Sequence, residues 1–128
     1  MKQELEDTLF TDFPLLYNKN DSIYTSCMGF GFECGDGWYG IIRKLSEELY
    51  PLIQNFPPDE YGYGPKASQV KEKFGALRFY MSCETDEMAE LIQVAEAASE
   101  KTCEICGEPG SIDYKKKWLS CRCEKHRE

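Results

Sequence analysis

Apolar side chains recur at helical spacing in two stretches of this 128-residue chain. One stretch begins at Gly37 and the other covers residues 85–102, and their apolar positions are Ile41, Ile42, Leu45, Leu49, Leu52, Ile53 and Phe56, then Met88, Leu91, Ile92, Ala95 and Ala98. Such stripes predict two helices, each with one buried face. Thr85 is expected to cap the second helix. Pro51 is expected to kink the first helix or make it restart.

Between these helices the apolar period falls to two. Alternation with charged residues holds on both sides of Gly75, but the phase changes there, which predicts two strand segments joined by a bulge or tight turn. A short helix within residues 2–17, a strand-like segment at 22–25 and a loop over 55–68 complete the pattern. We therefore predict an α+β fold with two or three helices packed on a small antiparallel sheet. Its expected core is Trp38, Leu45, Leu49, Leu77, Phe79, Leu91 and Ile92.

Charge is divided unevenly along the chain. Residues 1–100 carry 8 basic and 18 acidic side chains, a net of -10, whereas residues 101–128 carry 7 and 5, a net of +2. This predicts an acidic body (residues 1–101) and a docked C-terminal module (residues 102–128), because the second helix leads into the module without a linker. A hydrophobic fraction of 41% excludes a disordered chain. No apolar run is long enough to span a membrane and the N-terminus is charged, so we expect a cytoplasmic protein.

The C-terminal module contains four of the seven cysteines and the single histidine. Cys103 and Cys106 form a C-x2-C pair followed by Gly107, and Cys123 and His126 form a C-x2-H pair. Two such pairs predict one tetrahedral structural zinc ion in a zinc-knuckle or zinc-ribbon-like unit. The glycine allows the left-handed turn that directs two thiolates at one ion. The intervening residues are expected to form a hairpin covered by Ile112, Tyr114, Trp118 and Leu119.

The remaining cysteines leave one alternative open. Cys121 could replace Cys123 as the third ligand, although the compact C-x2-H pair favours Cys123. Outside the module, Cys27, Cys34 and Cys83 are expected to be small buried side chains rather than ligands.

Catalytic chemistry finds little support in the sequence. The glycine-rich segment at 29–40 has neither a P-loop lysine nor G-x-G-x-x-G spacing, so we expect Asp36 to cap the following helix and Trp38 to anchor it. A small metal-dependent enzyme such as a nuclease would have to use Glu33, Asp36 and Glu72, with Lys71, Lys73 and Arg78 nearby. With His126 bound to zinc, no histidine remains as a general base. The sequence therefore predicts no catalytic or cofactor-binding residues beyond the zinc ligands.

Three segments together carry a resemblance. "GFECGDGWYGII" (31–42), "QVKEKFGALRFY" (69–80) and the terminal C-x2-C and C-x2-H pairs resemble, in that order, a family of small proteins of bacteria, prophages and phages. The resemblance covers roughly residues 27–126. It implies a phage or prophage setting, and the host cytoplasm if the protein is phage-encoded. It also favours Cys103, Cys106, Cys123 and His126 as the ligands, and it implies no activity.

These observations lead to a first functional hypothesis and two alternatives. The first is a non-enzymatic, zinc-stabilised protein-interaction protein, in a specific version a phage-encoded inhibitor of a host defence protein, whose acidic body suits a partner with a basic surface. The second is a nucleic-acid-associated accessory protein that uses the basic zinc hairpin with Lys115, Lys116, Lys117 and Arg122. The acidic body disfavours the second, and so does the expectation that Trp118 covers the hairpin internally. The metal-dependent enzyme is the third.

Overall fold

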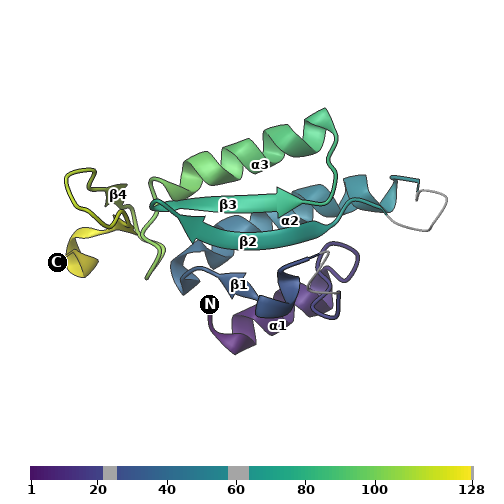
Figure 1. The fold of residues 1–128 in the computed structure, drawn as a ribbon, viewed down its shortest axis with the longest axis horizontal. Coiled ribbons are helices and arrows are strands. Elements are labelled where there is room, and N and C mark those ends of the chain that lie inside the picture. The colour runs from purple at the N-terminus through teal and green to yellow at the C-terminus, as the bar shows by residue number, and fades with distance from the viewer. Residues whose placement is uncertain (22–25, 58–63, 128) are drawn as a thin grey trace.

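The computed structural model describes residues 1–21, 26–57 and 64–127. Within these residues the chain forms three α-helices and two small sheets (Figure 1): α1 (Gln3–Asp12), β1 (Phe32–Glu33), α2 (Tyr39–Gln54), β2 (Ala67–Lys73), β3 (Ala76–Met81), α3 (Asp86–Ser99), β4 (Ser111–Ile112) and β5 (Cys121–Arg122). Short 3-10 turns cover Met28–Phe30, Asp36–Trp38 and Glu124–His126. The predicted α+β class is confirmed. The strand-like start predicted at 22–25, and residues 58–63 of the predicted loop, lie outside the described residues.

The larger sheet has the order β1-β2-β3. β2 and β3 are antiparallel and are joined by Phe74 and Gly75, whose φ angles of 54° and 85° are both left-handed. This two-residue turn explains the phase change in the sequence. β1 pairs with β2 in parallel, with Phe32 opposite Val70. The prediction of an antiparallel sheet was therefore wrong for β1, because α2 provides the crossover that a parallel pair requires.

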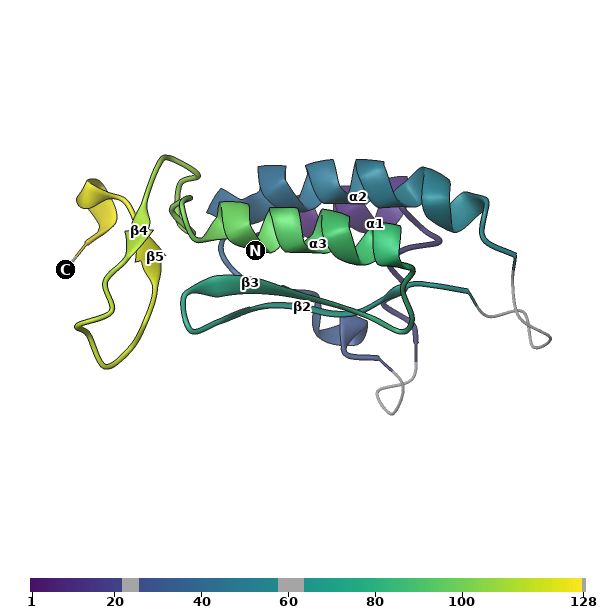
Figure 2. The same cartoon turned by 90° about the horizontal axis from the view of Figure 1, so that it is seen from above.

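The helices cover one face of the sheet (Figure 2). The apolar face of α2 and the α3 residues Met88, Ile92 and Ala95 meet inward-facing residues of β2 and β3 in a common core, which also includes Trp38, Leu45, Leu49, Leu77 and Phe79. Ala98, which was predicted to lie in the same stripe of α3, is exposed. Trp38 is fully buried, as expected of the residue that anchors α2. Leu91 is only partly buried, which corrects the predicted core. None of the described helices is long and apolar enough to cross a membrane.

The helix ends follow the local sequence in part. Thr85 caps α3, since its Oγ1 accepts the Met88 N–H at 3.3 Å. α2 continues through Pro51 to Gln54 without restarting, because a proline this close to the helix end removes one backbone hydrogen bond only. Asp36 does not cap α2. Its Oδ1 instead accepts the backbone N–H of Lys2 at 2.8 Å, at the start of α1.

Side chains from the helices close both edges of the larger sheet. On β3, the Leu77 N–H donates to Ser99 Oγ (2.9 Å) and the Phe79 N–H donates to Glu96 Oε2 (3.0 Å). On β1, the Phe32 N–H donates to Glu6 Oε1 (3.2 Å). These bonds satisfy edge amides that could otherwise recruit a foreign strand.

Candidate metal centre

Four side chains from the two predicted pairs converge in the C-terminal module. The ligand atoms of Cys103, Cys106, Cys123 and His126 all lie within 4.8 Å of one another. Cys106 Sγ lies 3.7 Å from Cys123 Sγ, and His126 Nδ1 lies 3.7 Å from Cys103 Sγ and 3.1 Å from Cys123 Sγ. Sulfurs about 2.3 Å from one tetrahedral zinc ion would be about 3.7 Å apart. The cluster therefore fits a tetrahedral ion held by three sulfurs and a histidine Nδ1.

The backbone around the first pair forms the expected turn. Gly107 has a φ of 81°, the left-handed conformation predicted for this position, and its N–H donates to the Cys103 carbonyl at 2.9 Å. Burial acts to raise the pKa of the Cys103 thiol, but backbone N–H groups of Cys106, Cys123 and Ile105 outweigh it and lower this pKa to about 6. The turn therefore favours the thiolate form that a metal ion binds.

The second pair comes from the end of a small hairpin. β4 and β5 are antiparallel, with Ile112 opposite Cys121, and the Glu124–His126 turn follows directly. The backbone N–H of Glu104 donates to the Cys121 carbonyl at 3.1 Å, which ties the Cys103–Cys106 turn to this hairpin. Together these bonds bring two pairs that are distant in the sequence to one point.

Cys121 itself is not part of the cluster. It is fully buried and belongs to the hydrophobic core, and burial raises its pKa. Of the two candidates for the third thiolate, the structure brings Cys123 to the other ligands. Among the other cysteines, Cys34 is buried as expected and Cys27 is partly buried. Cys83 is exposed, which corrects the prediction for it, because it lies in the loop between β3 and α3.

Glu104 joins the module to the body. Its buried side-chain carboxylate accepts a hydrogen bond from the Gly35 N–H (2.9 Å) and forms an ion pair with Arg122 (3.2 Å). Its backbone carbonyl accepts a hydrogen bond from the Gly37 N–H (2.8 Å). The Trp38 indole N–H also donates to the Thr102 carbonyl, at 2.9 Å. Module backbone thus lies directly against the glycine-rich segment.

The glycines of that segment are what allow this contact. A Cβ on Gly35 would overlap the Glu104 carbonyl, and a Cβ on Gly37 would overlap the Cys103 carbonyl and lie 2.6 Å from the Gly107 nitrogen. Any side chain at either position would therefore push the metal-binding turn away from the body. The glycine-rich segment, whose composition superficially suggested phosphate binding, therefore packs against the turn that carries Cys103 and Cys106.

The aromatic residues of the hairpin contradict their predicted role. Trp118 is 79% exposed and Tyr114 is 71% exposed, so neither covers the hairpin internally. The strands β4 and β5 have two residues each, and the space between them and the body is taken by Cys121 and by Ile112, which lies against Gly75. Trp118 takes no part in this contact, and its side chain is exposed.

The residues of the enzyme hypothesis have separate structural contacts. Glu33 accepts the Gln69 side-chain amide at 3.2 Å, and Glu72 accepts the Gly75 N–H at 2.7 Å within its own turn. Asp36 is bound to Lys2, as described above. Among the described residues, only the cysteine–histidine cluster forms a group that could hold a metal ion, so these three carboxylates are not gathered into one.

Two functional features escaped the sequence analysis. Glu104 sits between two ligand cysteines, and its role as the contact to the body depends on a glycine segment some 70 positions away, so no local signal identifies it. The exposure of Trp118 was also missed, although its position beside three lysines was a signal that the hairpin tip faces solvent. Comparison with protein-family models, curated proteins and solved structures found no match to this chain.

Proposed function

We propose that this protein is a non-enzymatic interaction protein stabilised by one structural zinc ion. The observation that supports it is the cluster of Cys103, Cys106, Cys123 and His126, which supplies four protein ligands. Four ligands complete a tetrahedral shell and leave no position for a water or a substrate, which is the arrangement of structural rather than catalytic zinc. The ion's role would be to hold the small hairpin together, because two strands of two residues cannot bury enough apolar surface alone.

The contact surface that we propose on the body is the outer face of α3. Glu87, Glu90 and Val94 follow one another at helical spacing and are all exposed, with Val94 at 67%. An exposed branched apolar side chain beside carboxylates suits a partner that offers an apolar patch within a basic surface. The net charge of -10 over residues 1–100 would speed the encounter with such a partner.

The family resemblance suggests which partner to test first. A phage or prophage setting makes a bacterial host protein the natural target, and we propose inhibition of a host defence protein. Metal-dependent catalysis is disfavoured by the separate structural contacts of Glu33, Asp36 and Glu72.

Affinity capture from nuclease-treated host lysate tests the proposal. Wild-type protein should retain a host protein that Glu90→Lys fails to retain, while Glu48→Lys, at an exposed position on α2, should behave as wild type. The captured protein should then bind the purified wild-type chain in isothermal titration calorimetry. Equal capture by both variants would contradict the assignment of α3, and hydrolysis of a nucleic acid by the zinc-loaded protein would contradict the non-enzymatic proposal.

A further inference from the structure

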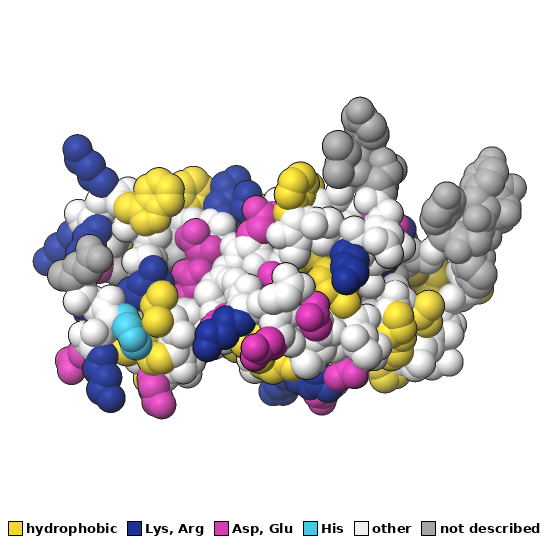
Figure 3. Space-filling view, turned by 90° about the horizontal axis from the view of Figure 1, so that it is seen from below, with side chains coloured by type: hydrophobic (Ala, Val, Ile, Leu, Met, Phe, Trp, Pro, Cys, Tyr) yellow, Lys and Arg dark blue, Asp and Glu magenta, His cyan; other side chains and the backbone are white. Residues whose placement is uncertain are grey.

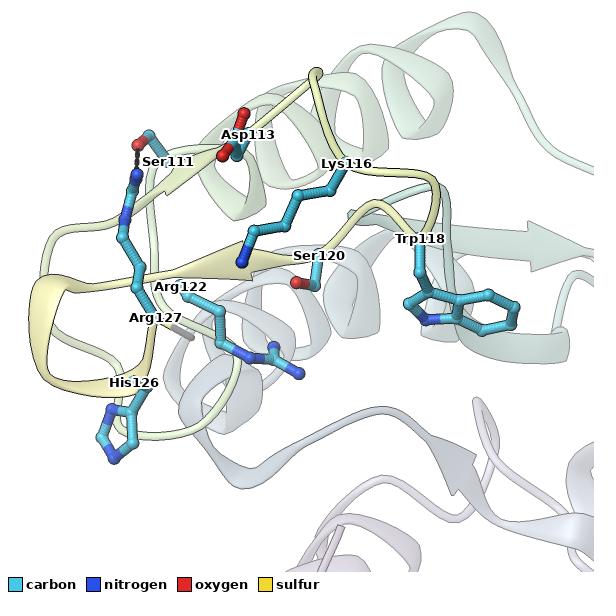
Figure 4. Close-up of a pocket in the computed structure, with 8 residues that line it drawn as sticks. All are labelled: Ser111, Asp113, Lys116, Trp118, Ser120, Arg122, His126 and Arg127. Atoms are coloured by element: carbon cyan, nitrogen blue, oxygen red, sulfur yellow. Dashed lines mark hydrogen bonds between the residues drawn. The ribbon is translucent and has the colours of Figure 1, made fainter.

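A pocket of about 390 Å³ opens on the C-terminal module, between the hairpin and the last described residues (Figure 4). Its lining includes Lys116, Trp118, Ser120, Arg122 and Arg127. Figure 4 shows the Lys116 side chain crossing toward Ser120 and Arg122, with the Trp118 ring at one rim and Arg127 on the opposite side. A volume of this order is enough for one nucleotide-sized group.

The pocket combines positive charge with an exposed aromatic plane. Three of its side chains are cationic, and Asp113 is its one acidic lining residue. Asp113 is already used locally, since its Oδ1 accepts the Lys115 N–H at 3.0 Å. Both described side-chain hydrogen bonds of Arg122, to Glu104 and to the Cys121 carbonyl, leave from Nη1, so its Nε and Nη2 groups face no described acceptor. The site is therefore suited to an anion.

The exposed indole narrows the class of anion. Trp118 is 79% exposed, and an apolar plane of this size held beside cations is the arrangement on which an unpaired base stacks while its phosphates meet the basic groups. An acidic peptide would use the cations but not the plane. A second hollow of about 420 Å³ shares Ser111, Arg122 and Arg127 with the first but adds no further cation and includes Glu124, so the proposed site is confined to the first pocket.

The position of the module weakens the repulsion that the acidic body exerts on a polyanion at the pocket. The module lies at one end of the long axis, away from most of the three helices (Figures 1 and 2), and basic side chains gather at that end of the surface (Figure 3). Charges separated by more than about 10 Å are largely screened at 0.1 M salt. A polyanion that approaches the module end therefore meets the local cations before the body's net charge.

We propose that the pocket bounded by Lys116, Trp118, Arg122 and Arg127 binds single-stranded nucleic acid, with one base stacked on Trp118 and the adjoining phosphates at the basic side chains. This activity is separate from the protein contact proposed for α3, since the two surfaces lie on different parts of the chain. The aromatic plane and the cations are both needed, so neither charge alone nor stacking alone accounts for binding.

Fluorescence anisotropy with labelled oligo-dT and oligo-rU of about 12 nucleotides tests the proposal on the zinc-loaded full chain. Affinity for at least one strand should fall roughly twentyfold between about 50 and 200 mM salt if about three phosphates are neutralised. Trp118→Ala should weaken binding by about tenfold or more. Tyr114→Ala is the matched control, because Tyr114 is an exposed aromatic of the same hairpin that does not line the pocket. Binding of both strands, or of only one, would support the site, and binding of only one would show whether the site prefers DNA or RNA.

Charge variants give the second arm. Lys116→Gln should weaken binding and reduce the salt slope by about 0.7, whereas Lys44→Gln on α2 should change neither. Each variant must first retain its zinc and its circular dichroism spectrum. Absence of binding at low salt, equal loss in Trp118→Ala and Tyr114→Ala, or equal affinity for polyglutamate would each overturn the proposal, the last in favour of an acidic peptide.

Discussion

Two cysteines that are only two positions apart in the C-terminal module lie in different environments. Cys121 and Cys123 both lie at the end of the hairpin, yet Cys121 is fully buried in the hydrophobic core and Cys123 joins the ligand cluster. Side chains two positions apart in an extended segment point to the same side, so the different positions of the two sulfurs depend on the Glu124–His126 turn, which begins directly after Cys123.

Replacing one exposed ligand separates metal binding from packing. Cys106 is exposed, so Cys106→Ser removes a ligand with little loss of buried surface, and we expect zinc content to fall from about one per chain to near zero. Cys121→Ala should keep the zinc but lower the free energy of unfolding by about 1–2 kcal/mol through lost packing. Elemental analysis and urea unfolding measure the two effects. Loss of zinc in Cys121→Ala with retention in Cys106→Ser would show that the ligand set is wrong.

A buried thiol predicts a response to alkaline pH. Burial, together with the nearby Glu104 carboxylate, raises the pKa of Cys34 from an ordinary value near 9 to about 12. A thiol whose pKa is raised by folding adds stability that is complete below the unfolded pKa and is lost as pH rises toward the folded value. We therefore expect the free energy of unfolding to fall between pH 9 and 12, with Cys34 contributing about 1–2 kcal/mol of the fall by about pH 10.5.

Urea unfolding at several pH values provides the measurement. Cys34→Ala should be less stable than wild type near pH 8, yet its stability should decline less steeply as the pH rises. Burial also raises the pKa of Tyr17, so part of the slope should remain in the variant. An identical slope in the two proteins would contradict the assignment to Cys34.

At the scale of elements, side chains rather than strands complete the sheet. Glu6 from α1 and Glu96 and Ser99 from α3 accept edge amides of β1 and β3. The same helices bury their apolar faces on the sheet, so each helix both covers a face and closes an edge. These side chains therefore occupy edge amides of the three-stranded sheet to which a strand of another chain would otherwise bond.

The close packing of the glycine-rich segment against the Cys103–Cys106 turn predicts different effects of alanine at two glycines. Gly37→Ala should destabilise the protein by about 2 kcal/mol or more, because the new methyl group would overlap the Cys103 carbonyl. Gly40→Ala is the control: a Cβ at Gly40 meets nothing within 4 Å, and alanine favours the helix, so stability should be unchanged or rise by up to about 1 kcal/mol. Thermal unfolding compares the two. Equal effects would mean that the turn does not rest on Gly37.

At the scale of the whole molecule, an acidic body over residues 1–100 is joined to a basic C-terminal segment that contains the cysteine–histidine cluster. The contacts between them pass through Glu104 and the buried Trp38. The body has its own core of helices and sheet, whereas the module's apolar contribution is limited to a few side chains such as Ile112 and Cys121. The two parts should therefore depend on the metal to different extents.

Removing the metal tests this difference. After chelation, we expect hydrogen exchange to rise across residues 102–127, while amides of β2, β3 and α2 remain protected. Readdition of zinc should restore the slow exchange, and a sham-treated sample controls for handling. Uniform loss of protection through the whole chain would show instead that body and module fold as a single unit and that the boundary at residue 101 has no physical meaning.

The sequence by itself determined the features that depend on neighbouring residues. The ligand pairs, the left-handed Gly107, the Thr85 cap and the turn at Gly75 all follow from spacings of a few positions, because local backbone geometry fixes them. The helices α2 and α3 were predicted from the helical spacing of their apolar residues, because a helix with one buried face repeats apolar side chains along its whole length. These features predicted most of the fold class and the set of metal-ligand candidates.

Only the tertiary structure decided which distant segments meet. Three such contacts join residues more than thirty positions apart. They are the parallel pairing of β1 with β2, the hydrogen bond between Asp36 and Lys2, and the hydrogen bond between Glu104 and Gly35. The exposure of Trp118 was decided in the same way, because the side chains of the hairpin that pack toward the body are those of Cys121 and Ile112. The hydrophobicity of a side chain indicates that it favours burial, but whether the interior has space for it depends on the assembled fold.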